Sequence, residues 1–232
     1  MKTDHIKVIA FDADDTLWDN QTQFTEVENR YCNILREYAS EEETRRSLFK
    51  VESSNMPEMG YGTKAFIISL IQNAVEISRQ QIPARQISEI LHMGMQLLEN
   101  PATPLSGVTA TLQRLQASRR YTLICFTKGE LLIQQNKFRR SGLAPYFDTL
   151  EIVSDKSREE YLHLCEANHI SPSEFMMVGN SFKSDIHPVV ELGGYGIYIP
   201  YKQMWQYEHL QEYTHERMVK LQKFEDITEI LR

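Results

Sequence analysis

The sequence predicts an α/β protein whose doubly wound parallel sheet is interrupted by an inserted all-helical domain. Short apolar runs bounded by polar or turn residues indicate buried strands, and helix-period patterns separate the later runs. Alternation of this kind is typical of a parallel sheet with helices on both faces. At 232 residues, the chain has room for one large domain that carries a sizeable insertion.

Five runs rich in Val, Ile, Phe and Tyr are the predicted strands. They cover residues 6–11, 121–126, 149–153, 175–178 and 196–199. One predicted helix leads into the second strand, and one further helix follows each of the second, third and fourth strands. These helices cover residues 108–117, 130–141, 157–168 and 183–192. Gly142 is well placed to end the second of them.

The interval between the first two strands carries helix-period apolar positions instead of a strand pattern. Ser40 followed by Glu43 is a capping-box pattern, which predicts the start of a helix. Two further helices are predicted over residues 65–78 and 85–99, and Pro101 closes the block. The interval is therefore expected to be all helical.

The insertion is too long for an ordinary connection, so we predict a separate lid domain over residues 18–101. Residues 1–17 and 102–232 form the predicted α/β core domain. The C-terminal segment 201–232 is amphipathic and is expected to pack on that core.

Composition excludes several classes of protein. The chain has 25 Lys and Arg against 32 Asp and Glu, a net charge of -7, so it lacks the basic surplus of a general nucleic-acid or anionic-membrane binder. Its three cysteines are widely spaced and form no C-x-x-C pair, which favours reduced thiols. The first apolar run is too short for a signal peptide or a membrane span. We therefore expect an intracellular, cytoplasmic protein.

The strongest chemical signal follows the first predicted strand. Asp12 and Asp14 are two residues apart in an extended segment, so both side chains can face one site at the carboxyl edge of the sheet. Two carboxylates there repel each other, and a divalent cation would offset that repulsion. Mg²⁺ prefers oxygen ligands and keeps waters that a substrate phosphate can displace.

Polar residues also follow the later predicted strands. Thr127 comes after the second strand, Lys156 after the third, and Asn180 and Asp185 after the fourth. A hydroxyl, an ammonium and another carboxylate are therefore expected at the same sheet edge as Asp12. This set suits phosphoryl transfer, in which a carboxylate attacks and cationic groups neutralise charge.

Asp12-x-Asp14-x-Thr16, Thr127, Lys156 and Gly179-Asn180-x-x-x-x-Asp185 resemble, in order, the four motifs of the haloacid dehalogenase-like superfamily. The resemblance covers nearly the whole chain. It implies a Rossmann-like core and, because the helical insertion follows the first motif, the helical cap of the first subfamily.

The resemblance also implies roles for single residues. Asp12 would be the nucleophile that forms an aspartyl-phosphate, and Asp14 the general acid that then activates water. Mg²⁺ would be held by Asp12, Asp185 and the backbone carbonyl of Asp14, with Asn180 in contact through water. Thr127, Lys128 and Lys156 are the candidate phosphate-binding residues. Two residues depart from the family pattern: Asn180 stands where many relatives have an acid, and Ser157 where proline is common.

Asp14 bears on the type of reaction. An ester leaving group needs a proton and a halide does not, and haloacid dehalogenases of this superfamily lack an acid at that position. The expected function is therefore a phosphatase for a small phosphorylated metabolite. A sugar-phosphate mutase, a 2-haloacid dehalogenase and a non-catalytic phosphometabolite-binding protein are the alternatives. The substrate's identity and the oligomeric state stay open.

Specificity is expected to reside in the lid. Trp18 and Asn20 follow the first motif and are expected to line the mouth of the site. Residues 56–64, with Tyr61 and Lys64, are predicted to join two lid helices, either as a loop that approaches the site or as an ordinary connection. Lys64 by itself does not establish the Schiff-base chemistry of phosphonate-cleaving relatives.

Overall fold

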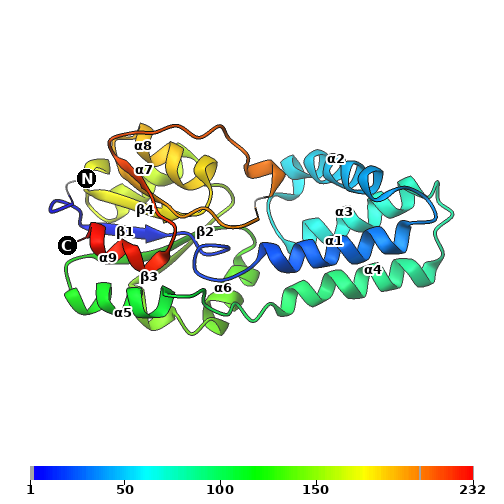
Figure 1. Cartoon of the computed structure of the whole chain (residues 1–232), viewed down its shortest axis with the longest axis horizontal. Helices are drawn as coiled ribbons and strands as arrows, with labels where there is room; N and C mark the ends of the chain where they lie inside the picture. The colour runs from blue at the N-terminus through cyan, green and yellow to red at the C-terminus, as the bar shows by residue number, and fades with distance from the viewer. Residues whose placement is uncertain (1–2, 204, 232) are drawn as a thin grey trace. The chain divides into compact units, whose positions relative to one another are not determined.

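The computed structural model describes residues 3–203 and 205–231. Residues 1, 2, 204 and 232, which belong to the predicted core domain, lie outside the described residues. The chain divides into two compact units (Figure 1). An α/β unit contains the residues up to Gln21 and those from Pro101 onwards, and a helical unit contains Thr22–Asn100.

The α/β unit contains a six-stranded sheet in the order β3-β2-β1-β4-β5-β6, and every neighbouring pair is parallel. The strands are β1 (Val8–Phe11), β2 (Thr122–Lys128), β3 (Thr149–Val153), β4 (Phe175–Gly179), β5 (Tyr195–Tyr198) and β6 (Met218–Lys220). Strand order reverses direction at β1, which lies between β2 and β4. The predicted doubly wound parallel α/β fold is confirmed.

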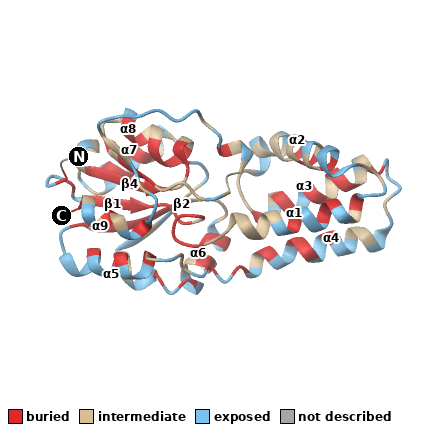
Figure 2. Cartoon of the chain, in the orientation of Figure 1, coloured by how far each residue is buried: buried red, intermediate tan, exposed pale blue. Residues whose placement is uncertain are grey.

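Residues along β1 alternate between two apolar clusters, one on each face of the sheet. Ile9 and Phe11 belong to a cluster that includes residues of α5 (Val108–Ser118) and α9 (Ile227–Ile230). Val8 and Ala10 belong to a second cluster with residues of α7 (Arg158–Ala167) and α8 (His187–Glu191). Figure 2 shows β1 and β4 as buried strands. Burial on both faces is the reason that β1 and β4 are almost continuously apolar, whereas β3 is partly exposed.

The structure differs from the prediction at several element ends. Strand β2 runs through Lys128, so Thr127 lies inside the strand and not after it. The predicted helix 183–192 is a π-helical turn, Phe182–Ile186, followed by the short helix α8. Strand β6 lies in the C-terminal segment, where no strand was predicted. The segment packs on the core as expected, because Phe224, Ile227 and Leu231 are buried in the first cluster.

The remaining elements of the α/β unit are α6 (Leu131–Arg140), the short 3₁₀ turns Ala144–Tyr146, Pro172–Glu174, Gln206–Glu208 and Phe224–Asp226, and their connecting loops. The three cysteines of the chain are free and buried, as the sequence indicated.

Four helices form the helical unit: α1 (Gln21–Leu35, whose first residue belongs to the α/β unit), α2 (Glu41–Met59), α3 (Thr63–Ile77) and α4 (Ala84–Gln96), followed by a 3₁₀ turn at Leu97–Glu99. They enclose an apolar core of their own. The predicted capping box is confirmed, because the Ser40 side chain accepts from Glu43 N and the Glu43 carboxylate accepts from Ser40 N. Among the described residues, no helix is both long and apolar enough to cross a membrane.

The predicted connection 56–64 is wrong in extent. Helix α2 continues through Pro57 to Met59, and α3 starts at Thr63, so only residues 60–62 join them. Pro57 lacks the N–H that would bond to the carbonyl four residues earlier, and the positive φ of Gly60 (66°) ends the helix soon after it.

Candidate active site

Asp12 lies at the carboxyl end of β1, between the ends of β2 and β4. Its backbone N–H donates to the carbonyl of Val178 (2.9 Å), which continues the β1–β4 ladder by one residue. The side chain is buried. A parallel sheet offers a ligand site at this edge, where the strand order reverses.

Lys156 joins Asp12 to Asp185. Its Nζ donates to Asp12 Oδ1 (2.5 Å) and to Asp185 Oδ1 (2.7 Å), and all three side chains are at most one-tenth exposed. Burial lowers the pKa of Lys156, but the two carboxylates outweigh burial and raise it above its ordinary value. Lys156 is therefore a fixed cation between two acids. We name these three residues the Lys156 cluster.

The nucleophile candidate is electrostatically unusual. The pKa of Asp12 is raised to about 7: burial is the largest cause, Lys156 opposes it, and the nearby charge of Asp185 adds to it. One ammonium shared between two buried carboxylates leaves a net negative charge when both acids are ionised. A further cation at this place would stabilise that state.

Asp185 is positioned by the π-helical turn that follows β4. Its Oδ2 accepts from the backbone N–H of Ser181 (2.9 Å). Gly179, the last residue of β4, leaves room for this carboxylate, because a Cβ at that position would lie 2.1 Å from Asp185 Oδ2. The glycine of the fourth motif is thus required by close approach of a side chain.

Thr16 and Asn180 surround the other oxygen of Asp12. Thr16 Oγ1 lies 3.2 Å from Asp12 Oδ2. The Asn180 carboxamide, oriented with its nitrogen toward the acceptors, donates to Asp12 Oδ2 (3.2 Å) and to the backbone carbonyl of Asp14 (3.2 Å). An amide at position 180 therefore contacts the nucleophile candidate without adding a further negative charge.

The Asp14 side chain contacts a different lysine. Lys137 Nζ donates to Asp14 Oδ1 and Oδ2 (2.8 Å each), Trp18 Nε1 donates to Oδ1 (2.7 Å), and Gln134 Nε2 lies 3.2 Å from Oδ2. Gln134 also donates to Thr127 Oγ1 (2.8 Å). We name Asp14, Lys137, Gln134 and Trp18 the Lys137 cluster. Gln134 connects it to the predicted phosphate-binding threonine.

Trp18 and Asn20 both contact the Lys137 cluster, and a place for Asn20 at the mouth of the site remains a prediction. Trp18 is buried, and its indole binds Asp14, so it does not line an opening. The side chain of Asn20 accepts from Lys137 Nζ (2.9 Å). Asp15 has a positive φ (64°) and accepts from the backbone N–H groups of Asn20 and Gln21 (2.9 Å each) at the start of α1.

Lys128 belongs to a separate ion pair. Its Nζ donates to Glu208 Oε1 (2.5 Å) and to Ser184 Oγ (2.9 Å). Glu208, from the C-terminal segment, also accepts from the hydroxyl groups of Ser181 (2.5 Å) and Ser184 (2.6 Å). Burial raises the pKa of Glu208, but Lys128 and the two hydroxyl groups lower it on balance. The C-terminal segment therefore fastens the loop that carries Asp185.

Tyr61 and Lys64 lie in the helical unit. Tyr61 is in the short connection between α2 and α3, and Lys64 is in the first turn of α3. Their contact with a substrate remains a prediction.

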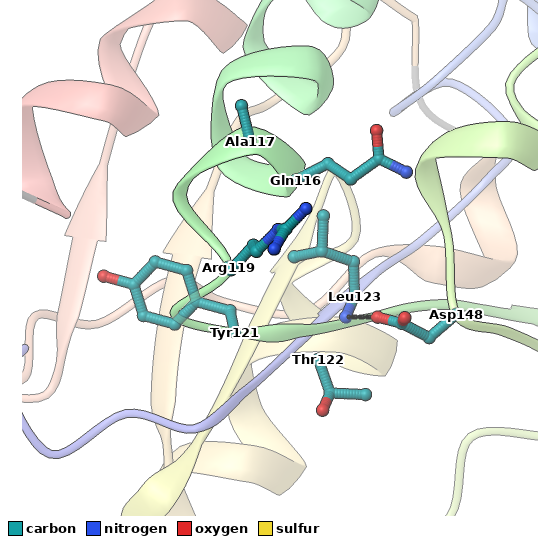
Figure 3. A pocket seen from close by; sticks show the side chains of 7 residues that line it. All are labelled: Gln116, Ala117, Arg119, Tyr121, Thr122, Leu123 and Asp148. Carbon is teal, nitrogen blue, oxygen red and sulfur yellow. Dashed lines mark hydrogen bonds between the residues drawn. The ribbon is translucent and has the colours of Figure 1, made fainter.

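A hollow of about 500 Å³ lies at the opposite end of β2 (Figure 3). Its lining residues are Gln116, Ala117, Arg119, Tyr121, Thr122, Leu123 and Asp148. Asp148 is already engaged, since its Oδ2 accepts from the backbone N–H of Leu123 (2.8 Å). None of the predicted site residues lines this hollow.

The donor set at the carboxyl edge fits a magnesium ion that keeps several waters. Within the described part of the chain, no three His, Cys, Asp or Glu residues gather into a ready-made metal cluster. Two carboxylates, those of Asp12 and Asp185, and the backbone carbonyl of Asp14 are the available oxygen donors. Mg²⁺ typically takes one or two protein carboxylates and fills its remaining positions with water and substrate oxygen.

The family model of haloacid dehalogenase-like hydrolases matches residues 6–188, which include the Lys156 cluster and the Lys137 cluster. The chain belongs to this family. A solved haloacid dehalogenase-like hydrolase from Xanthomonas campestris is 30% identical, with a TM-score of 0.86 over 98% of this chain and 92% of the other. No curated protein gives a significant match.

More distant haloacid dehalogenase-like structures share the fold. The HAD-hydrolase YfnB from Bacillus subtilis, described as bound to magnesium, is 15% identical, with a TM-score of 0.68 over 97% of this chain and 98% of the other. A 2-haloacid dehalogenase from Pseudomonas syringae pv. Tomato DC3000 is 19% identical, with a TM-score of 0.61 over 97% and 98%. A HAD phosphatase from Thermococcus onnurineus is also similar. Similar folds thus occur with different activities, so the chemistry must be argued from the site.

Sequence reasoning missed three residues of this haloacid dehalogenase-like site: Gln134, Lys137 and Glu208. Gln134 and Lys137 are three apart on α6, so they share a helix face, and a polar pair on the face that follows a catalytic strand was an available signal. Glu208 gave no such signal, because its position depends on the path of the C-terminal segment.

Proposed function

We propose that this haloacid dehalogenase-like hydrolase is a Mg²⁺-dependent phosphatase that acts on a small phosphorylated metabolite through an aspartyl-phosphate on Asp12. The observation that carries the proposal is the combination of a buried carboxylate at Asp12, bridged by Lys156 to Asp185, with a second acid at Asp14. A nucleophile and a proton-handling acid two residues apart suit ester cleavage in two steps.

In the first step, an Asp12 carboxylate oxygen attacks phosphorus and the bond from phosphorus to the ester oxygen breaks. Asp14 gives a proton to the departing oxygen. In the second step, Asp14 takes a proton from water, which attacks phosphorus, and the bond from phosphorus to Asp12 breaks to release inorganic phosphate. Lys156 balances the charge at Asp12 throughout. Thr127 would donate a hydrogen bond to a phosphoryl oxygen.

Magnesium would be held by Asp12, Asp185 and the backbone carbonyl of Asp14, and Asn180 would reach it through a water molecule. When bound, it would supply positive charge against the phosphate oxygens. The shared lysine leaves the two carboxylates with surplus negative charge, which supports a cation site. The magnesium described for the Bacillus subtilis relative is consistent with this assignment.

The helical unit is proposed to act as a cap that selects the substrate, with Tyr61 and Lys64 as candidate contacts. Its position between the first motif and β2 in the sequence supports this role. The absence of an excess of basic residues favours a small phosphorylated molecule over a nucleic acid.

Phosphate release from para-nitrophenyl phosphate tests the proposal. Turnover should require Mg²⁺ and stop on addition of EDTA. Asp12→Asn should lower kcat at least ~10⁴-fold, since it removes the nucleophile. Asp4→Asn, an exposed aspartate in the same unit, should leave the rate unchanged. Wild-type activity in the Asp12→Asn protein would refute the mechanism.

Two further assays separate the alternatives. A mutase would rearrange a sugar phosphate without net release of phosphate, and a dehalogenase would release halide from a 2-haloacid. A protein that only binds phosphometabolites would turn over none of these compounds. We expect phosphate release alone, because Asp14 supplies the acid that a halide leaving group does not need.

A further inference from the structure

We propose that Lys137 is a positioning residue of the catalytic site, which holds the Asp14 carboxyl group where it serves the leaving group. This inference rests on the phosphatase function proposed above. It concerns a residue on α6, outside all four sequence motifs.

Geometry supports the assignment. The Lys137 ammonium contacts both oxygens of Asp14 at 2.8 Å, which fixes the distance of the carboxyl group from α6, and Trp18 Nε1 holds Oδ1 from a second direction at 2.7 Å. The third contact of the ammonium, at 2.9 Å, is the side-chain oxygen of Asn20. Each contact therefore uses one of the three N–H donors of the ammonium.

Burial is the second argument. The Lys137 side chain is only 4% exposed, whereas most lysines of soluble proteins keep their charge in water. A lysine is seldom buried unless it is paired, and Asp14 is the carboxylate with which it pairs here. An ammonium in this position is costly, which indicates a specific use for it.

The neighbours of Lys137 connect its cluster to the reacting groups. Gln134, three residues earlier on α6, contacts both Asp14 and Thr127. Trp18 holds Asp14 from its own loop. Helix α6 therefore sets the distance between the proposed acid and the proposed phosphate-binding hydroxyl. A displacement of even 1 Å at such a site is costly to the rate.

The test compares Lys137→Met, which removes the ammonium but keeps most of the stem, with Lys137→Arg, which keeps a cation. Phenyl phosphate, with a poor leaving group, and para-nitrophenyl phosphate, with a good one, are the substrates. Lys137→Met should lower kcat about 10- to 100-fold on phenyl phosphate and much less on para-nitrophenyl phosphate, with little change in KM. Lys137→Arg should recover part of the loss.

A double-mutant cycle tests whether Lys137 acts through Asp14. In an Asp14→Asn background, Lys137→Met should cause no further loss on phenyl phosphate. An equal loss in both backgrounds would overturn the inference, as would equal losses on the two substrates or a higher KM as the main effect. Lys220→Met, which removes the exposed ion pair with Glu212, is the matched control and should not change the kinetics.

A readout independent of turnover separates this inference from the phosphatase proposal. The chain has two tryptophans, so a Trp205→Phe background leaves Trp18, which contacts Asp14, as the single emitter. In that background, Lys137→Met should shift the Trp18 emission toward that of Asp14→Asn. An unchanged spectrum would contradict the inference, even if every phosphatase assay had failed for another reason.

Discussion

The α/β unit contains two buried lysines that pair with acids of the first motif, and their surroundings differ. Lys156 bridges two buried carboxylates, Asp12 and Asp185, whereas Lys137 holds Asp14 alone, whose side chain is 26% exposed. The first arrangement keeps surplus negative charge beside the nucleophile candidate. The second arrangement pairs one ammonium with one carboxylate, so it carries no net charge. The difference shows how one strand end can present two acids in different electrostatic settings.

The largest expected effect distinguishes the two lysines. Lys156→Met leaves two facing buried carboxylates, so it should reduce the free energy of unfolding by about 3–5 kcal/mol. It should also lower turnover at least ~10³-fold, since the charge at Asp12 loses its partner. Lys137→Met leaves one partly exposed carboxylate that keeps Trp18 and Gln134, and should cost about 1–2 kcal/mol. Urea unfolding at neutral pH measures both variants.

Equal destabilisation by the two substitutions would break the comparison. It would mean that the loss in the free energy of unfolding depends on the burial of the lysine and not on the number of acids with which it pairs.

A smaller effect on activity is expected at Gly179, which leaves room for the Asp185 carboxylate of the Lys156 cluster. Gly179→Ala places a Cβ against Asp185, so the carboxylate must leave Lys156 and activity should fall about 10²-fold. Gly142→Ala is the control, because a Cβ there meets nothing within 4 Å although its φ is 71°. It should cost about 1 kcal/mol of stability and no activity. Wild-type kinetics for Gly179→Ala would show that activity does not require the contact between Asp185 and Lys156.

The smallest effect concerns Glu52, a half-buried acid of the helical unit. Partial burial, together with the nearby charge of Glu28, raises the pKa of Glu52 from 4.5 to about 8. The folded state therefore binds more protons than the unfolded state between about pH 4.5 and 8. Its contribution to stability is present below pH 4.5 and is lost as the pH rises through 8.

Relative to Glu52→Gln, the wild-type protein should thus lose roughly 1–3 kcal/mol of stability between pH 5 and pH 9. Denaturant unfolding at several pH values measures this. Glu58→Gln, an exposed position on the same helix, is the matched control and should show no pH-dependent difference. If Glu52→Gln and the wild-type protein showed the same pH dependence of stability, the pKa of Glu52 would not be raised in the folded state.

The predictable part of the structure was the part determined by strand ends. Asp12 and Asp185 follow the buried apolar strands β1 and β4, and Lys156 follows the partly exposed strand β3. A parallel sheet brings the carboxyl ends of its strands to one edge. The same pattern predicted the sheet and five of its strands, because burial on both faces leaves a continuous apolar signal. The capping box at Ser40 was visible because its two residues are three apart in sequence.

The remainder depended on tertiary contacts. Lys137 and Gln134 form a polar pair on one helix face, but this weak signal locates a site only once the helix is packed against the first motif. The sequence position of Trp18 suggests the mouth of the site, but its indole is buried and donates to Asp14. Glu208 reaches the Asp185 loop from a segment whose path carries no periodic pattern. A π-helical turn likewise replaced the predicted helix at 182–186, since only packing selects this rare geometry.

Covalent capture of the phosphoryl group tests the central claim most directly. Enzyme mixed with excess para-nitrophenyl phosphate and Mg²⁺ is quenched in acid within the first turnover, and its peptides are examined by mass spectrometry. We predict a mass increase of one phosphoryl group on the peptide that contains Asp12, and none in Asp12→Asn. Phosphate release without any phosphorylated peptide, or phosphorylation of a different residue, would contradict the account.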